Sequence, residues 1–311
     1  MKKISILVPC YNEEEVINIF YSEIIKIIST LNYEFEILFV NDGSKDNSLY
    51  LIKKLNEKDK RIQYLDLSRN YGKEIAMAAG IDYLTGDAMI IIDIDLQDPP
   101  ELIPKFIKYW EEGFDDVYAQ RISRSGESFL KKFTSKVYYR LLKNISKIPI
   151  QVDTGDYRLL SKKGIEALRK LRESQRYTKG LFSIIGLKKK AILYDRKPRA
   201  AGKTKWSYFK LCGLAIDGIV SFTIFPLRVA TILGIIIFIF SFCYILYILW
   251  TTLCYGNKVA GYPSLIVVIL FLGGVQLISL GIIGEYLGRV FNETKNRPLY
   301  FINEYSKTID K

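Results

Sequence analysis

Residues 88–101 read AMIIIDIDLQDPPE, an apolar run that stops abruptly at acidic residues. Five apolar residues precede Asp93, Asp95 and Asp98, which fall within six positions. Carboxylates this close repel one another unless a cation or a polar ligand lies among them. Together with Gln97 they offer only hard oxygen ligands, which suit Mg²⁺ or Mn²⁺ sharing its coordination with substrate phosphates. The stretch therefore predicts a buried strand that ends at a ligand site.

The sequence around this stretch alternates between two patterns from its start to about Gln120. Short β-branched runs lie at 4–8, 35–40, 62–67, 88–94 and 115–120. Segments with apolar residues three and four positions apart lie between them, at 14–31, 47–56, 73–84 and 101–111. This alternation is typical of a mostly parallel α/β sheet that binds ligands at the carboxyl ends of its strands.

Polar clusters follow four of the predicted strands. They read PCYNEEE at 9–15, NDGSKDNS at 41–48, SRNYGKE at 68–74 and DIDLQDPP at 93–100. Asn, Asp, Gly and Ser are also ordinary turn formers and helix caps, and for any single cluster that interpretation is favoured. Four successive clusters would line one edge of the sheet, so together they predict a crevice. Asp98, followed by two prolines, is expected to be a turn and cap residue rather than a third ligand.

Composition narrows the chemistry. The chain has 311 residues, a net charge of +12 and no histidine, so the commonest general base and transition-metal ligand are both absent. The four cysteines, Cys10, Cys212, Cys243 and Cys254, show no CxxC spacing and predict neither a disulfide framework nor a zinc site. The first residues lack a signal-peptide cleavage site and read as a strand, so the N-terminal unit is expected to stay in the cytoplasm.

The C-terminal third has a different character. Two nearly uninterrupted apolar runs, at about 227–250 and 265–287, each have roughly the 20 residues needed to span about 30 Å of hydrocarbon. Buried helices of a large soluble core are the alternative. The connector between the runs carries one lysine, whereas Lys and Arg crowd both outer flanks. The positive-inside bias then predicts a bacterial-type cell membrane protein with its N-terminal domain and both termini in the cytoplasm.

The expected organisation has four parts. They are a domain at 1–206, an amphipathic juxtamembrane helix at 207–226, two transmembrane helices within 227–288, and a cytoplasmic tail at 289–311. The juxtamembrane segment fits the first turns of a longer span equally well. The positive charge suits an anionic membrane surface and anionic substrates rather than nucleic acid. Gln276 and Ser279, near several glycines, suit helix packing and a homo-oligomer formed through the spans.

The motifs together resemble the family 2 glycosyltransferases of GT-A fold. Within them the chain is similar to the polyprenyl-phosphate glycosyltransferases, the group of dolichyl-phosphate mannose synthase and bactoprenol (undecaprenyl-phosphate) glucosyltransferase. The motifs are VPCYNEEE, FVNDGSKDNS, LSRNYGKEIAMAAG, IDIDLQDPPE, DTGDYRLLSKK, AGKTKWSYFKL, the two spans and GEYLGRVFNETKNRPLYFI. The resemblance runs through nearly the whole chain and implies a GT-A catalytic domain.

The resemblance also implies roles for individual residues. The nucleotide sugar would be bound by Pro9, Tyr11, Glu13, Asp42, Lys73 and Asp93. The divalent cation would be bound by Asp95 and Gln97. The acceptor phosphate would be bound by Arg121, Lys131, Ser135, Arg199 and Lys205. Lys131 stands where the family has an arginine, and a lysine lacks the planar group that binds a phosphate through two parallel hydrogen bonds. The alternative for Lys73 is that it is an ordinary solvated lysine. The alternative for Arg199 and Lys205 is that they are simply attracted to anionic lipid headgroups.

The resemblance implies that the catalytic base is Asp156 of VDTGDYRLL, with Asp153 as a structural alternative that caps a turn. A lipid phosphate is already largely ionised near neutral pH, so Asp156 need not remove a proton. The implied reaction is an inverting, Mg²⁺- or Mn²⁺-dependent transfer of a hexose from a UDP-sugar, such as UDP-glucose, to undecaprenyl phosphate for cell-envelope glycosylation.

Three other functions are alternatives to this one. A processive polysaccharide synthase would be expected to carry Gln-x-x-Arg-Trp and more spans, where this chain has GKTKW and two. A membrane-anchored dehydrogenase would need a GxGxxG cradle after the first strand, which reads PCYNEEE. A non-catalytic scaffold would not need the carboxylates and cations gathered at the strand ends.

Overall fold

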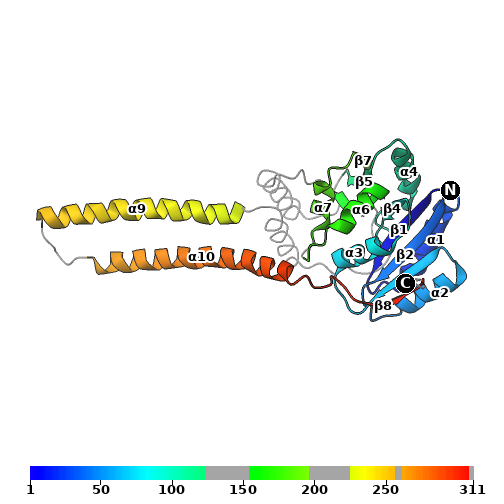
Figure 1. Ribbon diagram of the computed structural model, residues 1–311, viewed down its shortest axis with the longest axis horizontal. Coiled ribbons are helices and arrows are strands. Elements are labelled where there is room, and N and C mark those ends of the chain that lie inside the picture. The colour runs from blue at the N-terminus through cyan, green and yellow to red at the C-terminus, as the bar shows by residue number, and fades with distance from the viewer. Residues whose placement is uncertain (123–153, 175, 196–224, 256–260, 308–311) are drawn as a thin grey trace. The chain divides into compact units, whose positions relative to one another are not determined.

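The structure is a computed structural model of the chain, and it describes residues 1–122, 154–174, 176–195, 225–255 and 261–307. The chain divides into two compact units. The first comprises Met1–Gly218 together with Arg297–Lys311, and the second comprises Ile219–Asn296. The first unit contains a β-sheet covered by helices, and the second contains a pair of long helices (Figure 1).

Eight strands form one sheet in the described part of the first unit, in the order β7-β5-β6-β4-β1-β2-β3-β8. The strands are β1 (Lys3–Cys10), β2 (Glu34–Asn41), β3 (Ile62–Leu67), β4 (Ala88–Ile91), β5 (Asp116–Arg121), β6 (Thr154–Ser161), β7 (Lys189–Tyr194) and β8 (Ile302–Tyr305). β1 pairs in parallel with β2 and β4, β2 with β3, and β5 with β7. The other three pairs, β4–β6, β5–β6 and β3–β8, are antiparallel. The predicted mostly parallel α/β sheet is confirmed.

Helices cover both faces of this sheet. They are α1 (Ile17–Ile28), α2 (Ser48–Lys58), α3 (Lys73–Tyr83), α4 (Ile103–Glu111), α6 (Lys162–Lys170) and α7 (Thr178–Ile184), with the short 3-10 helix η1 (Pro100–Leu102). Side chains alternate along a strand, so Ile6 and Leu7 of β1 point to opposite faces. Ile6 joins a buried cluster with α1, α2 and α4, and Leu7 lies under Gly80 of α3.

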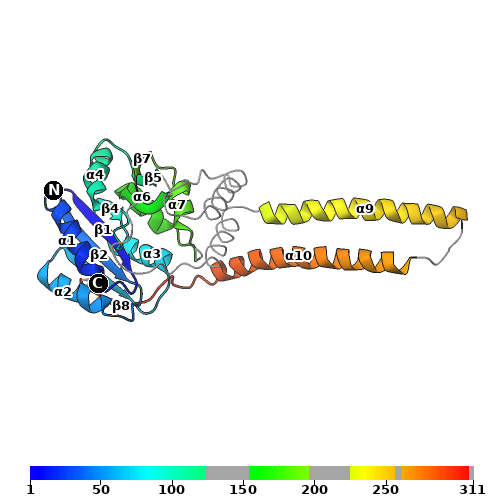
Figure 2. The ribbon, with the colours of Figure 1, turned by 180° about the vertical axis from the view of Figure 1, so that it is seen from behind.

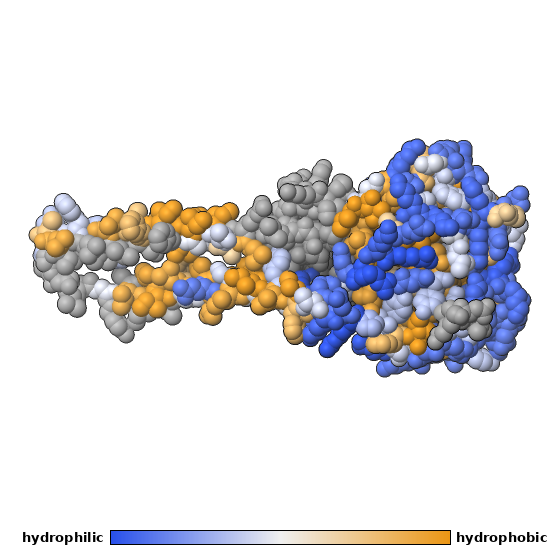
Figure 3. Space-filling view, in the orientation of Figure 1, coloured by the Kyte–Doolittle hydropathy of each residue, from blue (hydrophilic) through white to orange (hydrophobic). Residues whose placement is uncertain are grey.

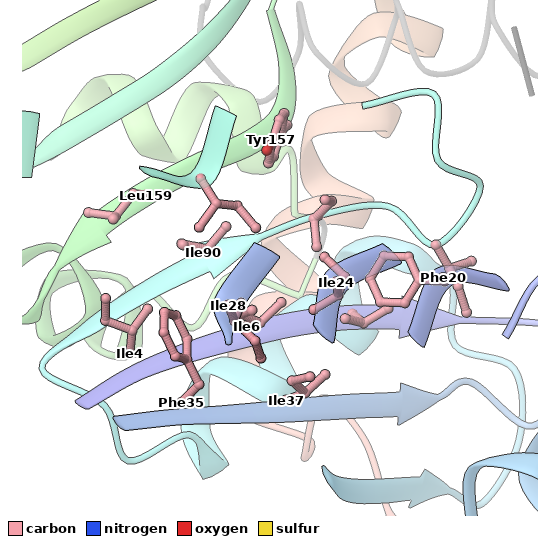
Figure 4. Packing of buried hydrophobic residues seen from close by; sticks show 14 of the residues in the cluster. Ile4, Ile6, Phe20, Ile24, Ile28, Phe35, Ile37, Ile90, Tyr157 and Leu159 are labelled. Atoms are coloured by element: carbon pink, nitrogen blue, oxygen red, sulfur yellow. The ribbon is translucent and has the colours of Figure 1, made fainter. Parts of the chain in front are cut away.

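The packing on these two faces follows from the residues available. Phe20, Ile24 and Ile28 recur at helical spacing on α1 and face Ile6 and Ile37 of the sheet (Figure 4). On the other face, a Cβ at Gly80 would lie 2.1 Å from a Leu7 methyl carbon, so only glycine permits α3 to lie this close. This close packing fixes α3, whose first residue is Lys73, against the centre of the sheet.

Two strands that the sequence pattern does not predict complete one half of the sheet. β6 inserts between β4 and β5, and β7 extends the edge beyond β5. β6 carries a fully buried Arg158, whose guanidinium lies 3.1 Å from the carboxylate of Asp116 on β5. Because a buried charge is tolerated only when it is paired and hydrogen-bonded, this ion pair accounts for an arginine at a core position.

The end of the chain belongs to the first unit. Residues 289–311 are expected to be a tail, but Ile302–Tyr305 forms β8 and pairs antiparallel with β3 at the sheet edge. Figure 1 shows this red strand beside the blue sheet, near the C-terminus. The compact unit accordingly includes the residues from Arg297 onward, so the boundary at 289 does not match the structural division.

The second unit consists, in its described residues, of α9 (Phe225–Tyr255) and α10 (Tyr262–Thr294). The two helices lie side by side in both ribbon views (Figures 1 and 2). Much of the visible surface of the two helices is apolar (Figure 3). Among the described residues, Phe271–Thr294 is long and apolar enough to cross a membrane, and Val229–Tyr244 is a shorter apolar stretch. The two-span arrangement therefore stays a prediction, and 207–224 of the juxtamembrane segment lie outside the described residues.

Candidate active site

The centre of the site is an ammonium group between two carboxylates. Nζ of Lys73 lies 2.6 Å from Asp93 Oδ1 and 2.6 Å from Asp156 Oδ2. The antiparallel register explains why the carboxylates meet, because β4 and β6 pair Ile91 with Arg158. Because the strands run in opposite directions, the same register sets Asp93, two residues after Ile91, opposite Asp156, two residues before Arg158. Lys73, in the first turn of α3, supplies the charge that offsets their repulsion.

Electrostatics keeps Asp156 ionised. Burial raises the pKa of this carboxyl, but the nearby cations Lys73, Lys179 and Arg158 lower it by more than burial raises it. The net pKa is well below the usual range. Burial lowers the pKa of Lys73, while Asp156 and Asp93 raise it above its ordinary value. The second oxygen of Asp156, Oδ1, is buried and has no hydrogen-bond partner among the described residues. A carboxylate held this way can orient a substrate or stabilise positive charge, and it is a poor proton acceptor.

The loop that leads to Lys73 is held by Asp42, which lies just after β2. Its carboxylate accepts hydrogen bonds from the backbone N–H groups of Tyr71 at 2.7 Å and Gly72 at 2.9 Å. Gly72 has a φ of +93°, a conformation that side chains with a Cβ rarely adopt. Burial raises the pKa of Asp42, and the two backbone hydrogen bonds oppose that rise. Asp42 therefore shapes the loop, and its predicted contact with the nucleotide stays a prediction.

In the Asp-x-Asp turn, the second carboxylate, that of Asp95, is almost completely buried. Asp95 is 7% exposed, and its Oδ1 accepts a hydrogen bond from the backbone N–H of Gln97 at 3.2 Å. Leu96 between them has a φ of +56°, and a non-glycine residue in this region is strained by roughly 1–2 kcal/mol. Within the described residues, no group of three acidic or cysteine side chains could hold a metal ion alone. Asp95 and Gln97 fit a hard cation only when substrate oxygens and water complete its coordination.

A hydrogen-bonded chain links the last strand pair to this turn. The hydroxyl of Tyr194 on β7 donates to Asp98 at 2.6 Å and accepts a 3.4 Å hydrogen bond from Nε of Arg121 on β5. Arg121 also lies beside Gly155, next to Asp156, since a Cβ there would be 3.4 Å from its guanidinium. The predicted acceptor residue Arg121 is therefore close to the predicted catalytic residue. The N-cap of η1 is Pro99, and the described contact of the Asp98 carboxylate is with Tyr194.

Sequence reasoning missed one further contact. The carboxylate of Glu74, next to Lys73, accepts hydrogen bonds from the backbone N–H and the hydroxyl of Thr178 at the start of α7. This contact holds the segment before α7 against the first turn of α3, beside Asp156. Glu74 is a common residue in a first helical turn, where it complements the helix dipole, so its identity gave no signal of a distant partner.

The remaining predicted site residues divide into two groups. Pro9 is buried at the end of β1 and opposite Val40 of β2, while Tyr11 and Glu13 lie half-buried in the loop that follows. That loop is tied to the next one, because Ser48 Oγ accepts a hydrogen bond from the Glu13 backbone N–H at 2.8 Å. The other group, Lys131, Ser135, Arg199 and Lys205, lies outside the described residues, as does the alternative base Asp153.

Comparison with known proteins gives two family matches. Glycosyl transferase family 2 matches residues 5–169, and the GtrB C-terminal hairpin matches residues 225–290. The first match covers the strands and loops that carry Lys73, Asp93 and Asp156. The second covers most of α9 and α10.

Individual relatives match over almost their full length. An uncharacterized glycosyltransferase of Synechocystis sp. is 48% identical over 97% of this chain and 95% of its own. A prophage bactoprenol glucosyl transferase homolog of Escherichia coli (strain K12) is 45% identical over 98% of this chain and 100% of its own. The bactoprenol glucosyl transferase of Shigella phage SfX is 46% identical over 96% and 98%. Among solved structures, mannosyl-3-phosphoglycerate synthase from Rubrobacter xylanophilus is 15% identical. The match covers 70% of this chain and 71% of that one, with a TM-score of 0.49.

The family 2 match covers more than half of the chain, and the relatives above share 45–48% of their residues with it over nearly its whole length. The chain is a glycosyltransferase that belongs to glycosyl transferase family 2, among relatives named bactoprenol glucosyl transferase.

Proposed function

We propose that the protein transfers a hexose from a UDP-sugar, such as UDP-glucose, to undecaprenyl phosphate at the cytoplasmic face of the membrane. The observation that carries the proposal is the meeting of Lys73, Asp93 and Asp156 beside Arg121 in a family 2 glycosyltransferase. The names of the bactoprenol relatives support a polyprenyl phosphate as acceptor. The product would be a lipid-linked sugar for cell-envelope glycosylation.

The donor would lie along the strand ends. Pro9, Tyr11 and Glu13 would contact the nucleobase and ribose, with Asp42 and Asp93 accepting further hydrogen bonds. Asp95 and Gln97 would hold Mg²⁺ or Mn²⁺ against the diphosphate. When bound, the cation would neutralise the charge that develops on the departing UDP. Because Asp95 is buried and provides few ligands, the cation is expected to bind tightly only with the nucleotide present.

The acceptor would enter from the side of Arg121. Its guanidinium would bind the lipid phosphate, helped by Lys131, Ser135, Arg199 and Lys205. A phosphate oxygen would attack the anomeric carbon from the face opposite UDP, forming the new C–O bond as the bond to UDP breaks. The result is a single displacement with inversion. The ionised Asp156 would orient the acceptor or stabilise positive charge on the sugar ring, since a phosphate needs no deprotonation.

The membrane arrangement forms part of the same proposal. Both helices of the hairpin would span the bilayer, with the catalytic domain and both termini in the cytoplasm. This arrangement would bring an apolar acceptor to a water-soluble donor at one membrane face. A homo-oligomer would form through the spans, where Gln276 and Ser279 lie on α10.

The test uses the full chain in membranes that contain undecaprenyl phosphate. Radiolabelled UDP-glucose, UDP-N-acetylglucosamine and UDP-galactose are supplied one at a time, with Mg²⁺, Mn²⁺ or EDTA. One nucleotide sugar is expected to label the lipid in a metal-dependent way, and undecaprenol, which lacks the phosphate, is expected to remain unlabelled. Asp95→Asn should lower transfer by roughly 100-fold or more. Equal labelling of undecaprenol would overturn the acceptor, and a labelled polymer would favour a processive synthase.

A further inference from the structure

The ammonium of Lys73 is already engaged by carboxylates of the protein itself. An ammonium has three N–H donors, and two of them are directed at Asp93 and Asp156 at 2.6 Å each. Lys73 is the first residue of α3, and α3 is fixed by the close packing of Gly80 on Leu7. The backbone that carries the ammonium therefore has little freedom to move toward a ligand.

The charges around Asp156 make this ammonium hard to replace. Two further acidic groups face the same region, Asp93 from the end of β4 and Glu74 from α3. The cations Lys179 of α7 and Arg158 of β6 also act on Asp156, but Arg158 is already paired with Asp116. If Lys73 moved to a diphosphate, Asp156 would stay buried among acidic groups without its nearest cation, which is costly.

We propose that Lys73 is a positioning residue for Asp156 and Asp93, and not a ligand of the donor diphosphate. Its ammonium binds Oδ2 of Asp156 and thereby fixes the orientation of the carboxylate, whose other oxygen, Oδ1, is buried without a hydrogen-bond partner among the described residues. The same ammonium holds Asp93 in register with Asp156 across the β4–β6 pair. The inference rests on the proposed transfer reaction, and it predicts that Lys73 acts on the rate of transfer rather than on donor binding.

The experiment separates these two effects with the full chain in detergent or membranes. Lys73→Met, Lys73→Arg and the matched control Lys105→Met, on the exposed surface of α4, are compared with the unmodified chain. UDP binding in the presence of Mn²⁺ is measured by calorimetry, and kcat and the donor KM by transfer of label to undecaprenyl phosphate. Lys73→Met is expected to lower kcat by roughly 100-fold, because a misplaced catalytic group costs about that much. Its Kd for UDP is expected to change less than about threefold, and Lys73→Arg, which keeps the charge, should regain part of the rate.

The same substitution is also made in a chain that already carries Asp156→Asn. In Asp156→Asn the main partner is already neutral, so adding Lys73→Met should lower the remaining rate by much less than it does in the unmodified chain. A tenfold or greater loss of UDP binding in Lys73→Met, with the same loss in the Asp156→Asn background, would show a diphosphate ligand and overturn the proposal. If Lys73→Met does not fold, Lys73→Arg decides by the same comparison of kcat with UDP binding. UDP binding is measured without acceptor, so failure of the lipid-transfer reaction in the unmodified chain is a separate outcome.

Discussion

At the scale of single residues, Glu36 shows how a buried charge is used far from the predicted site. It is 4% exposed on β2, at the amino end of the sheet. Its carboxylate lies 2.7 Å from Lys3 Nζ and accepts hydrogen bonds from Ser5, from the backbone N–H of Thr85 and from the Thr85 hydroxyl. Lys307, beyond β8, adds a contact at 3.2 Å. One carboxylate thus joins β1, the segment between α3 and β4, and the residues that follow β8.

These contacts predict a pH-dependent contribution to stability. Burial raises the pKa of Glu36, but Lys3, Ser5 and Thr85 lower it to about 2. A lowered carboxyl pKa contributes stability above the unfolded pKa of about 4.3, and that contribution is lost as the pH falls toward about 2. Glu36→Gln should therefore cost about 3 kcal/mol at pH 7, and its effect should shrink below pH 4.

The measurement is the thermal unfolding midpoint of the solubilised full chain at pH 7 and near pH 3. A drop of roughly 5–10 °C is expected at pH 7 for Glu36→Gln. Glu34→Gln, at the exposed start of the same strand, is the matched control and should change the midpoint little. Equal midpoints for the two variants at pH 7 would contradict the role assigned to Glu36.

A second residue-scale prediction concerns Tyr194. Its hydroxyl joins Asp98 to Arg121, so Tyr194→Phe should leave Arg121 less well held. If Arg121 binds the lipid phosphate, the KM for undecaprenyl phosphate should rise about fivefold, the effect of losing roughly one hydrogen bond. The KM for the UDP-sugar should stay unchanged. Steady-state kinetics with each substrate varied in turn measures both KM values, and Tyr118→Phe on the neighbouring strand is the control. A rise confined to the KM for the UDP-sugar would contradict this role of Tyr194.

At the scale of elements, the sequence predicts strands β1 to β5 and misses β6, β7 and β8. β1 to β5 are short runs rich in β-branched and other apolar residues, separated by segments of helical periodicity, and most of their positions are buried. β6 reads TGDYRLLS, and its buried Arg158 becomes reasonable only once Asp116 is known to lie beside it. β8 has four residues, INEY, and pairs with a strand more than 200 positions earlier. No local pattern signals a pairing over that separation.

The same limit applies to the site. Asp93, Asp95 and Gln97 stand out in the sequence because carboxylates and an amide follow an apolar run. The resemblance to a family directs attention to Asp156 and Arg121, which the structure does bring close together. The ion pairs of Lys73 could not be foreseen, because they depend on the β4–β6 register that sets Asp93 opposite Asp156.

β8 gives an element-scale prediction. The strand covers the edge of β3, where Asn303 donates to Asp66, and the Phe301 carbonyl accepts from the backbone N–H of Ser68. A chain that ends after Asn296 would expose the β3 edge and lose these contacts. Its thermal midpoint should fall by at least roughly 5 °C and it should aggregate more readily. A chain that ends after Lys307 keeps all of these contacts and is the control; equal midpoints for the two truncations would mean that β8 is dispensable.

At the scale of the whole molecule, two units of different chemistry are joined in one chain. The first carries the sheet, the carboxylate cluster and β8, while the second exposes apolar side chains along α9 and α10 (Figure 3). Large exposed apolar surfaces are rare on soluble monomers and mark contact with a membrane or a partner. The basic residues on both flanks of the apolar segments favour an orientation in which the hairpin crosses the bilayer twice.

This orientation predicts which side of the membrane each segment faces. In a chain whose native cysteines are replaced, a single Asn257→Cys is introduced between α9 and α10, and a single Lys45→Cys is introduced in the exposed loop after β2. If both helices span, a membrane-impermeant maleimide added to intact cells should label the first variant and reach the second only after permeabilisation. A hairpin that lies on the cytoplasmic face without crossing would leave both positions unlabelled in intact cells, because the connector would stay on the side of the catalytic domain. Transfer activity, measured in each variant before labelling, ensures that the accessible cysteine reports on the functional protein.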